Sequence, residues 1–377
     1  MAPKLMIVMR PVAGGMWEHL LTLLDGLDDE YEPVVCCQDD PEQLRLLASR
    51  SVRARVVPMP GHIRPFADAR AARLLRRAII EEQPAIVHSH GFHAGLLTAL
   101  VAPFAGRPPH VCTLHNMAVQ PGSGLARRLL YGFLQWLLVV LTPRVITVSE
   151  AVRNALPTGR RARNIIVISN GIDPRRVRPA MSADEARRQL DLDGTEPVVG
   201  CVARLAVEKG VDDFVRMAGR LTESRPEMAF VLVGDGPMRK TLQALGAELG
   251  LGDRMRFVGE HFPAVDFMQV FDVTVIPSIL EGQSLAAIES LFLGKPVVCT
   301  EVGGLAEVVT PEVGRLVRPR HPEDLARAVC EVLDSGQASR MGARGRDLAR
   351  SCFTAEKMVA RTKDVYRKVT AATGDAR

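Results

Sequence analysis

The chain has 377 residues, of which 47% are hydrophobic, 24% charged and 5% aromatic. This composition excludes a disordered or collagen-like chain, and the length predicts two domains at roughly 100–200 residues each. The net charge of +5 is uneven, because residues 1–178 hold 22 basic and 14 acidic residues and the remainder hold 26 and 29. A basic first half indicates an anionic partner, and with so few aromatic residues we expect a membrane surface or a phosphorylated ligand rather than nucleic acid.

Short apolar runs alternate with amphipathic stretches along the chain, which is typical of parallel α/β sheets. In the first half these runs predict seven strands: Leu5–Met9, Pro33–Cys37, Arg55–Val57, Ala85–His88, Val111–Leu114, Val145–Val148 and Ile165–Ile168. A helix is predicted over Met16–Leu27, because its apolar residues recur at helical spacing.

The second half repeats this rhythm after a linker that we place near Arg175–Ser182. The predicted strands are Val198–Val202, Phe230–Val233, Met255–Val258, Val273–Ile276, Val297–Cys299 and Arg315–Val317. Helices are expected near Val211–Leu221, Arg239–Leu249, Ser284–Leu293 and Glu323–Leu333. We therefore predict two Rossmann-like, doubly wound α/β domains, 1–177 and 178–377, facing across a cleft; a last helix could pack back on the first. Ligands of such sheets bind outside the carboxyl ends of the strands.

The segment Leu129–Leu141 is apolar nearly all round and is bracketed by Arg127-Arg128 and Arg144. Its length is below the roughly 18 apolar residues that cross a bilayer. We expect a buried core helix, and the alternative is a helix lying against anionic lipid.

Metal and disulfide sites are not expected. The seven cysteines show neither CxxC spacing nor clustering, which indicates reduced structural thiols and a cytoplasmic protein. The basic first half adds the expectation that the chain attaches peripherally to the inner face of the membrane. His88 and His90 share one face of an extended segment, but no further ligands follow at suitable spacing. Asp191-Leu192-Asp193 lies in linker-like sequence, so we assign no metal to it.

Two glycine-containing turns follow predicted strands. Gly14-Gly15 opens the first helix, where backbone N–H groups could approach an anion, although a simple tight turn explains the pair as well. Gly234 begins a Gly-Asp-Gly-Pro turn that lacks a third glycine, so a nicotinamide site is not predicted.

Charged residues gather where strands of the second half end. Arg204 and Lys209 follow a strand and suit phosphate oxygens, although a solvated loop paired with Glu208 is the alternative. Glu281 and Glu289 could bind sugar hydroxyls, or lie on the surface. The helix start at Ser284 and Leu285 offers N–H donors, and in the first half His115 ends a strand.

Together these segments resemble the retaining glycosyltransferases of family GT4, which have the GT-B fold. The motifs, in family order, are GGMWEHL, HSHGFHAGLL, TLHN, ITVSEAV, VISNGID, VARLAVEKG, LVGDGP, EGQSLAAIES and TEVGGLAEVV. One departure is Gln283-Ser284, where many members have a pair such as Phe-Gly.

The resemblance implies metal-independent transfer of a sugar from a nucleotide diphosphate sugar, with UDP favoured, to an acceptor hydroxyl. The acceptor is a small molecule, a glycan or a lipid-linked compound, and no cofactor is implied beyond the donor. By resemblance Arg204 and Lys209 bind the diphosphate, Glu281 the donor sugar and Glu289 the ribose. His115 lies near the reacting sugar, and Gly14 and Gly15 contact donor phosphate or acceptor. The alternatives are a nucleotide-sugar epimerase, a sugar phosphorylase, or a non-catalytic nucleotide- or lipid-binding protein.

Overall fold

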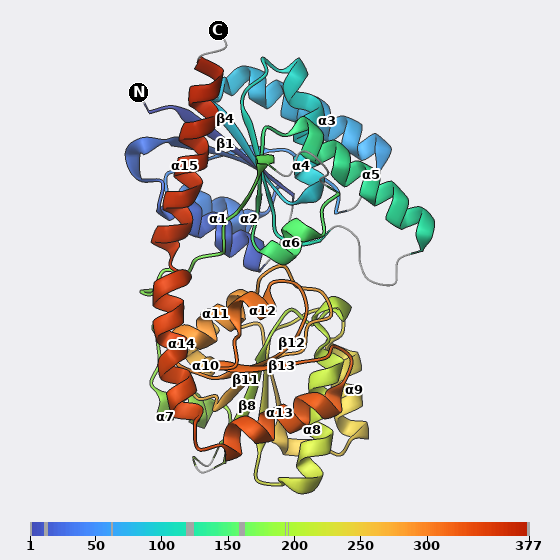
Figure 1. The fold of residues 1–377 in the computed structure, drawn as a ribbon, viewed down its shortest axis with the longest axis vertical. Helices are drawn as coiled ribbons and strands as arrows, with labels where there is room; N and C mark the ends of the chain where they lie inside the picture. Colours follow the sequence, from blue (N-terminus) through green and yellow to red (C-terminus); the bar gives the residue numbers. More distant parts are fainter. Residues whose placement is uncertain are drawn as a thin grey trace. The chain divides into compact units, whose positions relative to one another are not determined.

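A computed structural model of the protein describes residues 2–10, 14–61, 63–117, 124–157, 163–192, 194 and 196–374. The chain divides into unit 1, made of Met1–Gly171 and Ala355–Arg377, and unit 2, made of Ile172–Thr354 (Figure 1). Among the described residues, no helix is both long and apolar enough to span a membrane.

Unit 1 is built on a parallel sheet with the strand order β3-β2-β1-β4-β5-β6-β7. Its strands are β1 (Lys4–Met9), β2 (Glu32–Cys37), β3 (Arg53–Val56), β4 (Ile86–His90), β5 (His110–Leu114), β6 (Arg144–Thr147) and β7 (Ile165–Val167). The seven predicted strands are thus confirmed, with small shifts at their ends. Strand β4 runs on to His90 because the His-Ser-His run is buried between β1 and β5.

Helices cover both faces of this sheet. They are α1 (Gly15–Asp25), α2 (Pro41–Ala48), α3 (Pro65–Glu82), α4 (Phe92–Val101), α5 (Leu125–Leu141), α6 (Glu150–Asn154) and α15 (Ala355–Gly374). Alternate residues of β1 supply the two cores: Leu5 and Ile7 pack with α1 and α15, and Met6 and Val8 with α3 and α4. This period of two is what a strand buried on both faces requires.

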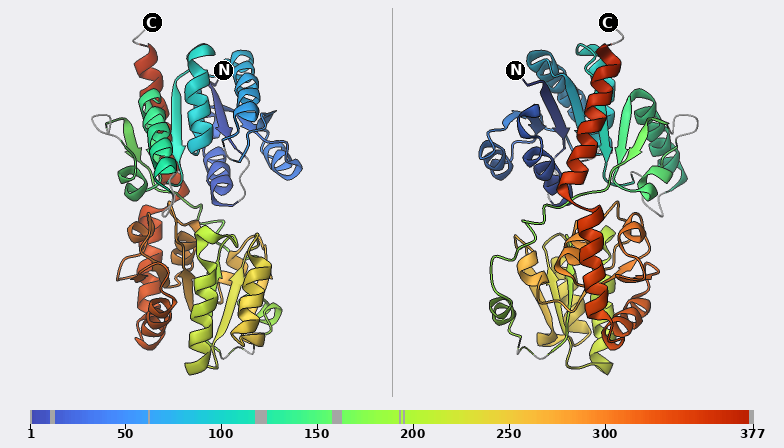
Figure 2. Two further views of the ribbon diagram at one scale, coloured as in Figure 1. Left: turned by 90° about the vertical axis from the view of Figure 1, so that its right-hand side faces the viewer. Right: turned by 60° about the vertical axis from the view of Figure 1, so that its left-hand side comes forward.

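The last helix, α15, belongs to unit 1 and lies on the same face of the sheet as α1 (Figures 1 and 2). Its Tyr366 is fully buried, and the hydroxyl lies 2.6 Å from Nδ1 of His88 on β4. Lys363 pairs with Asp28 at 2.9 Å and with Glu30 at 3.1 Å. Helix α15 therefore completes the core of unit 1.

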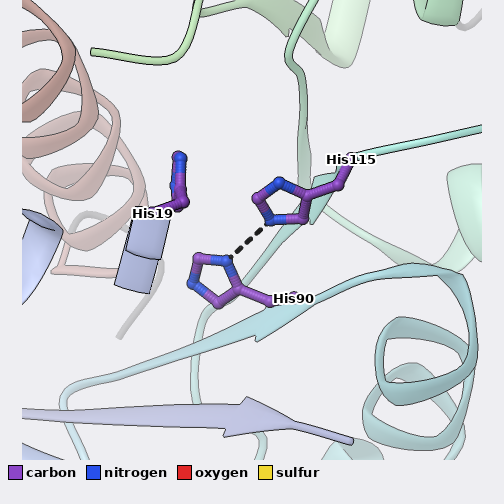
Figure 3. Close-up of side chains that lie close together, drawn as sticks. All are labelled: His19, His90 and His115. Carbon is purple, nitrogen blue, oxygen red and sulfur yellow. Dashed lines mark hydrogen bonds between the residues drawn. The ribbon is translucent and has the colours of Figure 1, made fainter. Parts of the chain in front are cut away.

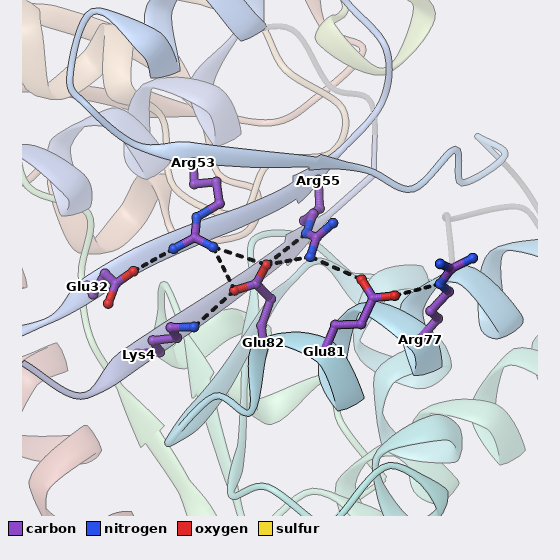
Figure 4. A network of polar contacts seen from close by, with 7 residues as sticks. All are labelled: Lys4, Glu32, Arg53, Arg55, Arg77, Glu81 and Glu82. Atoms are coloured by element: carbon purple, nitrogen blue, oxygen red, sulfur yellow. Dashed lines mark hydrogen bonds and ion pairs between the residues drawn. The ribbon is translucent and has the colours of Figure 1, made fainter.

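A buried carboxylate ties two strands, β1 and β3, to the end of α3 (Figure 4). Glu82 accepts hydrogen bonds from Lys4 at 3.2 Å, Arg53 at 3.1 Å and Arg55 at 2.8 Å. Burial alone would raise the pKa of Glu82, but the hydrogen bonds from Arg55 and Lys4 hold it below its usual value. These cations are thus engaged within the fold.

Unit 2 repeats the architecture with the strand order β10-β9-β8-β11-β12-β13, again all parallel. Its strands are β8 (Val198–Val202), β9 (Ala229–Val233), β10 (Met255–Gly259), β11 (Val273–Ile276), β12 (Val297–Thr300) and β13 (Gly314–Val317). Its helices are α7 (Ala183–Gln189), α8 (Val211–Ser224), α9 (Arg239–Glu248), α10 (Val265–Met268), α11 (Leu285–Leu293), α12 (Leu305–Val308), α13 (Pro322–Asp334) and α14 (Ala338–Cys352). Helices α8, α9 and α13 share one core, and α7, α11 and α14 share the other.

The boundary between the units falls before the predicted position at residue 177. Ile172 and Val177 are buried in the core of unit 2, and the backbone N–H of Ala180 donates to the Asp266 carboxylate at 2.6 Å. The sequence predicts a linker here because proline and arginine residues dominate the segment and give no sign of these contacts.

Helix α5 differs from the expected core helix. It begins at Leu125, and the side chains of Leu129 and Phe133 are 66% and 57% exposed. Within the helix only Gln135, Leu138 and Val139 are buried. The prediction of a buried helix is wrong, because an apolar sequence does not reveal which of its faces the sheet covers.

Candidate active site

In unit 2, the candidate donor-binding residues lie at one edge of the sheet. The strands β9, β8, β11 and β12 are neighbours and parallel, so their carboxyl ends meet there. Arg204 and Lys209 follow β8, Gly234 follows β9, and Glu281 and Ser284 follow β11. This edge is where open α/β sheets bind ligands.

Lys209 and Glu281 form the central contact of this edge. The Nζ of Lys209 donates to Oε2 of Glu281 at 2.7 Å, and the Ser278 hydroxyl donates to the same oxygen at 3.1 Å. The Glu281 side chain is 7% exposed and that of Lys209 is 26% exposed. Neither contact uses Oε1 of Glu281, so this oxygen can still accept hydrogen bonds from sugar hydroxyls.

Arg204 is held differently. Its guanidinium pairs with Glu208, four residues further along the chain, and its side chain is 56% exposed. The structure thus contains the Glu208 pair that the sequence offered as the alternative. An exposed pair of this kind contributes little to stability, so a phosphate could replace Glu208 at small cost.

Close backbone contacts fix the loops around these side chains. A Cβ on Gly234, whose φ is +137°, would lie 1.9 Å from the carbonyl oxygen of Ala203, directly before Arg204. A Cβ on Gly303, with φ +53°, would lie 1.6 Å from the carbonyl oxygen of Glu281. Both positions therefore require glycine for the loops to approach each other.

The start of α11 supplies the third feature. Ser284 is the N-cap, and its Oγ accepts a hydrogen bond from the backbone N–H of Ala287 at 3.2 Å. Leu285 opens the helix, and Glu289 lies half-buried within it. The first N–H groups of a helix favour an anion, so this helix start adds positive potential to an edge that already carries Arg204 and Lys209.

The remaining candidates, His115, Gly14 and Gly15, belong to unit 1. Gly14 is the N-cap of α1 with φ +81° and, like Gly15, is exposed. His115 directly follows β5 and is 8% exposed. Both features lie at the carboxyl end of their strands, the position that the sequence predicted for them.

Three histidines meet in unit 1: His19 on α1, His90 at the end of β4 and His115 directly after β5 (Figure 3). Nδ1 of His90 lies 3.1 Å from Nε2 of His115, so one ring donates a proton and the other accepts it. Nδ1 of His19 lies 3.0 Å from Oδ1 of Asn170; because an amide oxygen only accepts, Nδ1 carries the proton and Nε2 has a lone pair.

Burial keeps these rings neutral. It lowers the pKa of His19 to about 4, and the hydrogen bond to Asn170 opposes this shift only in part. The pKa values of His90 and His115 are lowered well below the usual value, again mainly by burial. Neutral imidazoles at this edge can orient and polarise a hydroxyl-bearing substrate without adding charge.

The potential metal ligands differ from those considered in the sequence. His19, His90 and His115 each offer one nitrogen, and these nitrogens lie within 4.8 Å of one another, so this trio could hold a metal ion. His88 cannot join them, because its ring nitrogens contact Tyr366 and, at 2.8 Å, Thr113. Of the Asp-Leu-Asp motif, Asp193 lies outside the described residues.

His19 and Asn170 take part in this histidine group, and the sequence does not single them out. His19 lies within the GGMWEHL segment, five residues after Gly14, and Asn170 lies within VISNGID. In each of these motifs, the sequence shows a polar residue within an otherwise apolar stretch, and this is the only local sign of a functional role. That signal does not identify which residues become partners.

Comparisons with known proteins identify the family of the chain. Residues 13–176 match the family described as Glycosyltransferase Family 4, and residues 182–348 match Glycosyl transferases group 1. The chain is 34% identical to the 2-deoxystreptamine glucosyltransferase of Streptomyces kanamyceticus over 270 residues, which are 66% of this chain and 67% of that protein.

A second relative and a solved structure extend over nearly the whole chain. The UDP-Gal:alpha-D-GlcNAc-diphosphoundecaprenol alpha-1,3-galactosyltransferase of Escherichia coli is 27% identical over 370 residues, 96% of this chain and 95% of that protein. The crystal structure of Anabaena HepE in complex with UDP-glucose superposes with a TM-score of 0.83 at 22% identity, covering 97% of this chain and all of that one. The predicted GT-B fold, with two Rossmann-like α/β units, is confirmed.

Proposed function

This chain belongs to the family 4 glycosyltransferases, and we propose that it moves a sugar from a UDP-sugar to an acceptor hydroxyl with retention of anomeric configuration and without a metal. The observation that carries the proposal is the Lys209–Glu281 contact at 2.7 Å, beside Arg204 and the start of α11. This edge offers cations and helix N–H groups for a diphosphate next to a carboxylate for a sugar.

In the proposed donor complex, Arg204 and Lys209 bind the diphosphate, and the N–H groups at Ser284 and Leu285 add to them. Glu281 accepts hydrogen bonds from donor-sugar hydroxyls through Oε1, and Glu289 accepts them from the ribose. Gly234 allows its loop to lie against the segment that carries Arg204. Glu208 is displaced from Arg204 by the diphosphate.

The reaction breaks the bond between the anomeric carbon and the diphosphate oxygen and forms a bond from that carbon to the acceptor oxygen. The acceptor proton passes to the leaving diphosphate oxygen, on the same face of the sugar. Negative charge grows on the leaving group, and Arg204, Lys209 and the start of α11 stabilise it. Positive charges supplied by the chain itself thus take the part that a divalent cation has in other transferases.

The proposed role of His115 is to orient the donor sugar or polarise its surroundings as a neutral imidazole. His19 and His90 position it, through the 3.1 Å contact between His90 and His115 and the nearby His19 ring. Gly14 and Gly15 open a helix whose first N–H groups can face donor phosphate or acceptor.

Relatives support UDP as the nucleotide, because the Escherichia coli relative and the Anabaena complex both carry UDP in their names. The names of the relatives point to different acceptors, because the Streptomyces kanamyceticus relative is named for 2-deoxystreptamine and the Escherichia coli relative for alpha-D-GlcNAc-diphosphoundecaprenol. We propose that the chain acts in the cytoplasm and makes peripheral contact with the inner face of the membrane, because residues 1–178 are strongly basic.

A thermal-shift screen over UDP-, GDP-, ADP-, CMP- and dTDP-sugars tests the donor assignment. A ligand at 100 times its Kd stabilises the fold by about 2.7 kcal/mol, which such a screen resolves. We expect UDP-sugars to give the largest shift. Consumption of the donor without an acceptor to give an isomeric nucleotide sugar would instead indicate an epimerase, and binding with no turnover on any acceptor panel would indicate a non-catalytic protein.

A further inference from the structure

Helix α5 presents apolar side chains to solvent along most of its length. Leu125, Leu129, Phe133 and Trp136 follow one another at spacings of four, four and three residues, so they form one stripe. Of the three buried residues of this helix, Gln135, Leu138 and Val139, Leu138 lies on the side opposite the stripe, and Val139 lies at the edge of the stripe. Helices on the surface of globular proteins carry polar residues there, and an exposed apolar patch of this kind marks an interaction site.

The orientation of α5 is fixed by the fold. Gly95 of α4 has no side chain, and a Cβ there would lie 3.3 Å from Leu138 of α5, so the two helices pack closely. Rotating the helix to bury the stripe would expose Leu138 and Val139, which are fully buried against β5 and β6. The exposed stripe is therefore a stable feature of unit 1.

Aromatic and basic side chains accompany the stripe. The rings of Phe133 and Trp136 stack with centroids 5.8 Å apart, and the Arg127 guanidinium lies 5.5 Å from the centre of the Tyr131 ring. Arg128 is also exposed in the same first turns. Tryptophan, tyrosine and arginine beside an apolar surface are the composition that favours the interface between lipid headgroups and acyl chains.

The surrounding charge selects the partner. Residues 83–149, which include α4 and α5, contain four arginines and no acidic residue. Three arginines of β3 and α3, Arg53, Arg55 and Arg77, are engaged elsewhere, because they pair with Glu81 or Glu82 (Figure 4). A second copy of α5 would supply another apolar stripe but no negative charge to pair with the arginines. An anionic bilayer supplies an apolar interior and negatively charged headgroups.

We infer that α5 docks unit 1 on an anionic membrane surface. The helix lies in the plane of the interface, and the stripe of Leu125, Leu129, Phe133 and Trp136 is inserted. At 17 residues the helix is about 26 Å long, and its two-sided burial pattern fits a helix lying on a bilayer. This inference rests on the peripheral membrane contact proposed above and names the residues that make it.

Vesicle co-sedimentation of the full chain tests the inference, using phosphatidylcholine with 25% phosphatidylglycerol against phosphatidylcholine alone. We expect binding to the anionic vesicles only, weakening steeply from 50 to 500 mM salt. The chain has two tryptophans, and Trp17 is buried whereas Trp136 is exposed, so a blue shift of tryptophan emission on binding reports Trp136. The doubly substituted Leu129→Glu/Phe133→Glu should lose at least tenfold in affinity, and Arg127→Gln about fivefold.

Phe262→Glu is the matched control, because Phe262 is a 77% exposed aromatic residue of unit 2 and should bind vesicles like the unaltered chain. Thermal unfolding of each variant with and without a UDP-sugar establishes that fold and donor site are intact, so failure of this inference is separate from failure of the proposed reaction. A chain that stays in the supernatant at low salt, or a double variant that binds as well as the original, overturns the inference. So does a dimer that the double variant abolishes without any vesicle binding.

Discussion

Replacing Lys209 by methionine separates the structural and chemical roles of the Lys209–Glu281 pair. The variant leaves the Glu281 carboxylate, 7% exposed, with the Ser278 hydroxyl at 3.1 Å as its remaining partner. An unpaired buried polar group costs about 1–3 kcal/mol, and because Lys209 is 26% exposed, water replaces part of its contribution; we expect about 1–2 kcal/mol. For a unit of this size each kcal/mol lowers Tm by about 2–4 °C.

The same change removes a charge that faces the leaving diphosphate. Losing about 2–4 kcal/mol of transition-state stabilisation lowers turnover by about 30- to 900-fold. The double variant Lys209→Met/Glu281→Gln removes the unpaired carboxylate, so its Tm should return toward the original while its turnover stays low. The assay is the initial rate of UDP release at a saturating concentration of the donor that gives the largest thermal shift.

Lys240→Met is the control, because Lys240 is an exposed lysine on α9 in the same unit. It should change neither Tm nor turnover. If Lys209→Met is destabilised as calculated but keeps its full rate of UDP release, the pair is structural, and Lys209 does not contact the diphosphate.

Four further outcomes are expected. Glu281→Gln should fold normally but lose discrimination between donor sugars that differ in one hydroxyl, measured as ratios of kcat/KM. Gly303→Ala should lower turnover at least tenfold through its clash with the Glu281 carbonyl, whereas Gly336→Ala, which has a similar φ of +65° and open space, should cost stability alone. Turnover should persist in excess EDTA, and loss restored by Mg²⁺ would contradict the charge argument. In the unfolded chain His19 takes up a proton near the ordinary histidine pKa of 6.5, whereas in the folded chain burial lowers its pKa to about 4. The free energy of unfolding should therefore decrease as the pH is lowered from 6.5 to 4, by about 3 kcal/mol from His19 alone. In urea titrations, His19→Gln should show a weaker dependence of this free energy on pH.

The sheets were predictable because their strands carry their own signal. Strand β1 is apolar from Leu5 to Met9 and β8 is apolar from Val198 to Val202, since helices cover both faces of each strand. The positions of Arg204, Lys209 and Glu281 were predictable for a related reason, because the carboxyl ends of parallel strands meet at one edge. The Lys209–Glu281 contact itself joins residues 72 positions apart and has no local signal.

Features that depend on distant partners were not predictable. The His19, His90 and His115 group joins one helix to two strand ends, and nothing near His19 in the sequence indicates that Asn170 will bind it. The prediction that α5 is a buried helix was wrong because its local sequence signal was strong but misleading. Its composition is that of a core helix, and only the fold shows that Gln135 faces inward while Phe133 faces out.

The anomeric configuration of the first product is the most direct test of the central claim. The enzyme, treated with EDTA, is incubated with a UDP-α-sugar and an acceptor or water, and the new anomeric proton is followed by NMR before mutarotation. Our account predicts release of UDP together with an α-configured product, and a rate that falls at least 30-fold in Lys209→Met. A β-configured first product, or UDP release that requires added metal, would contradict it.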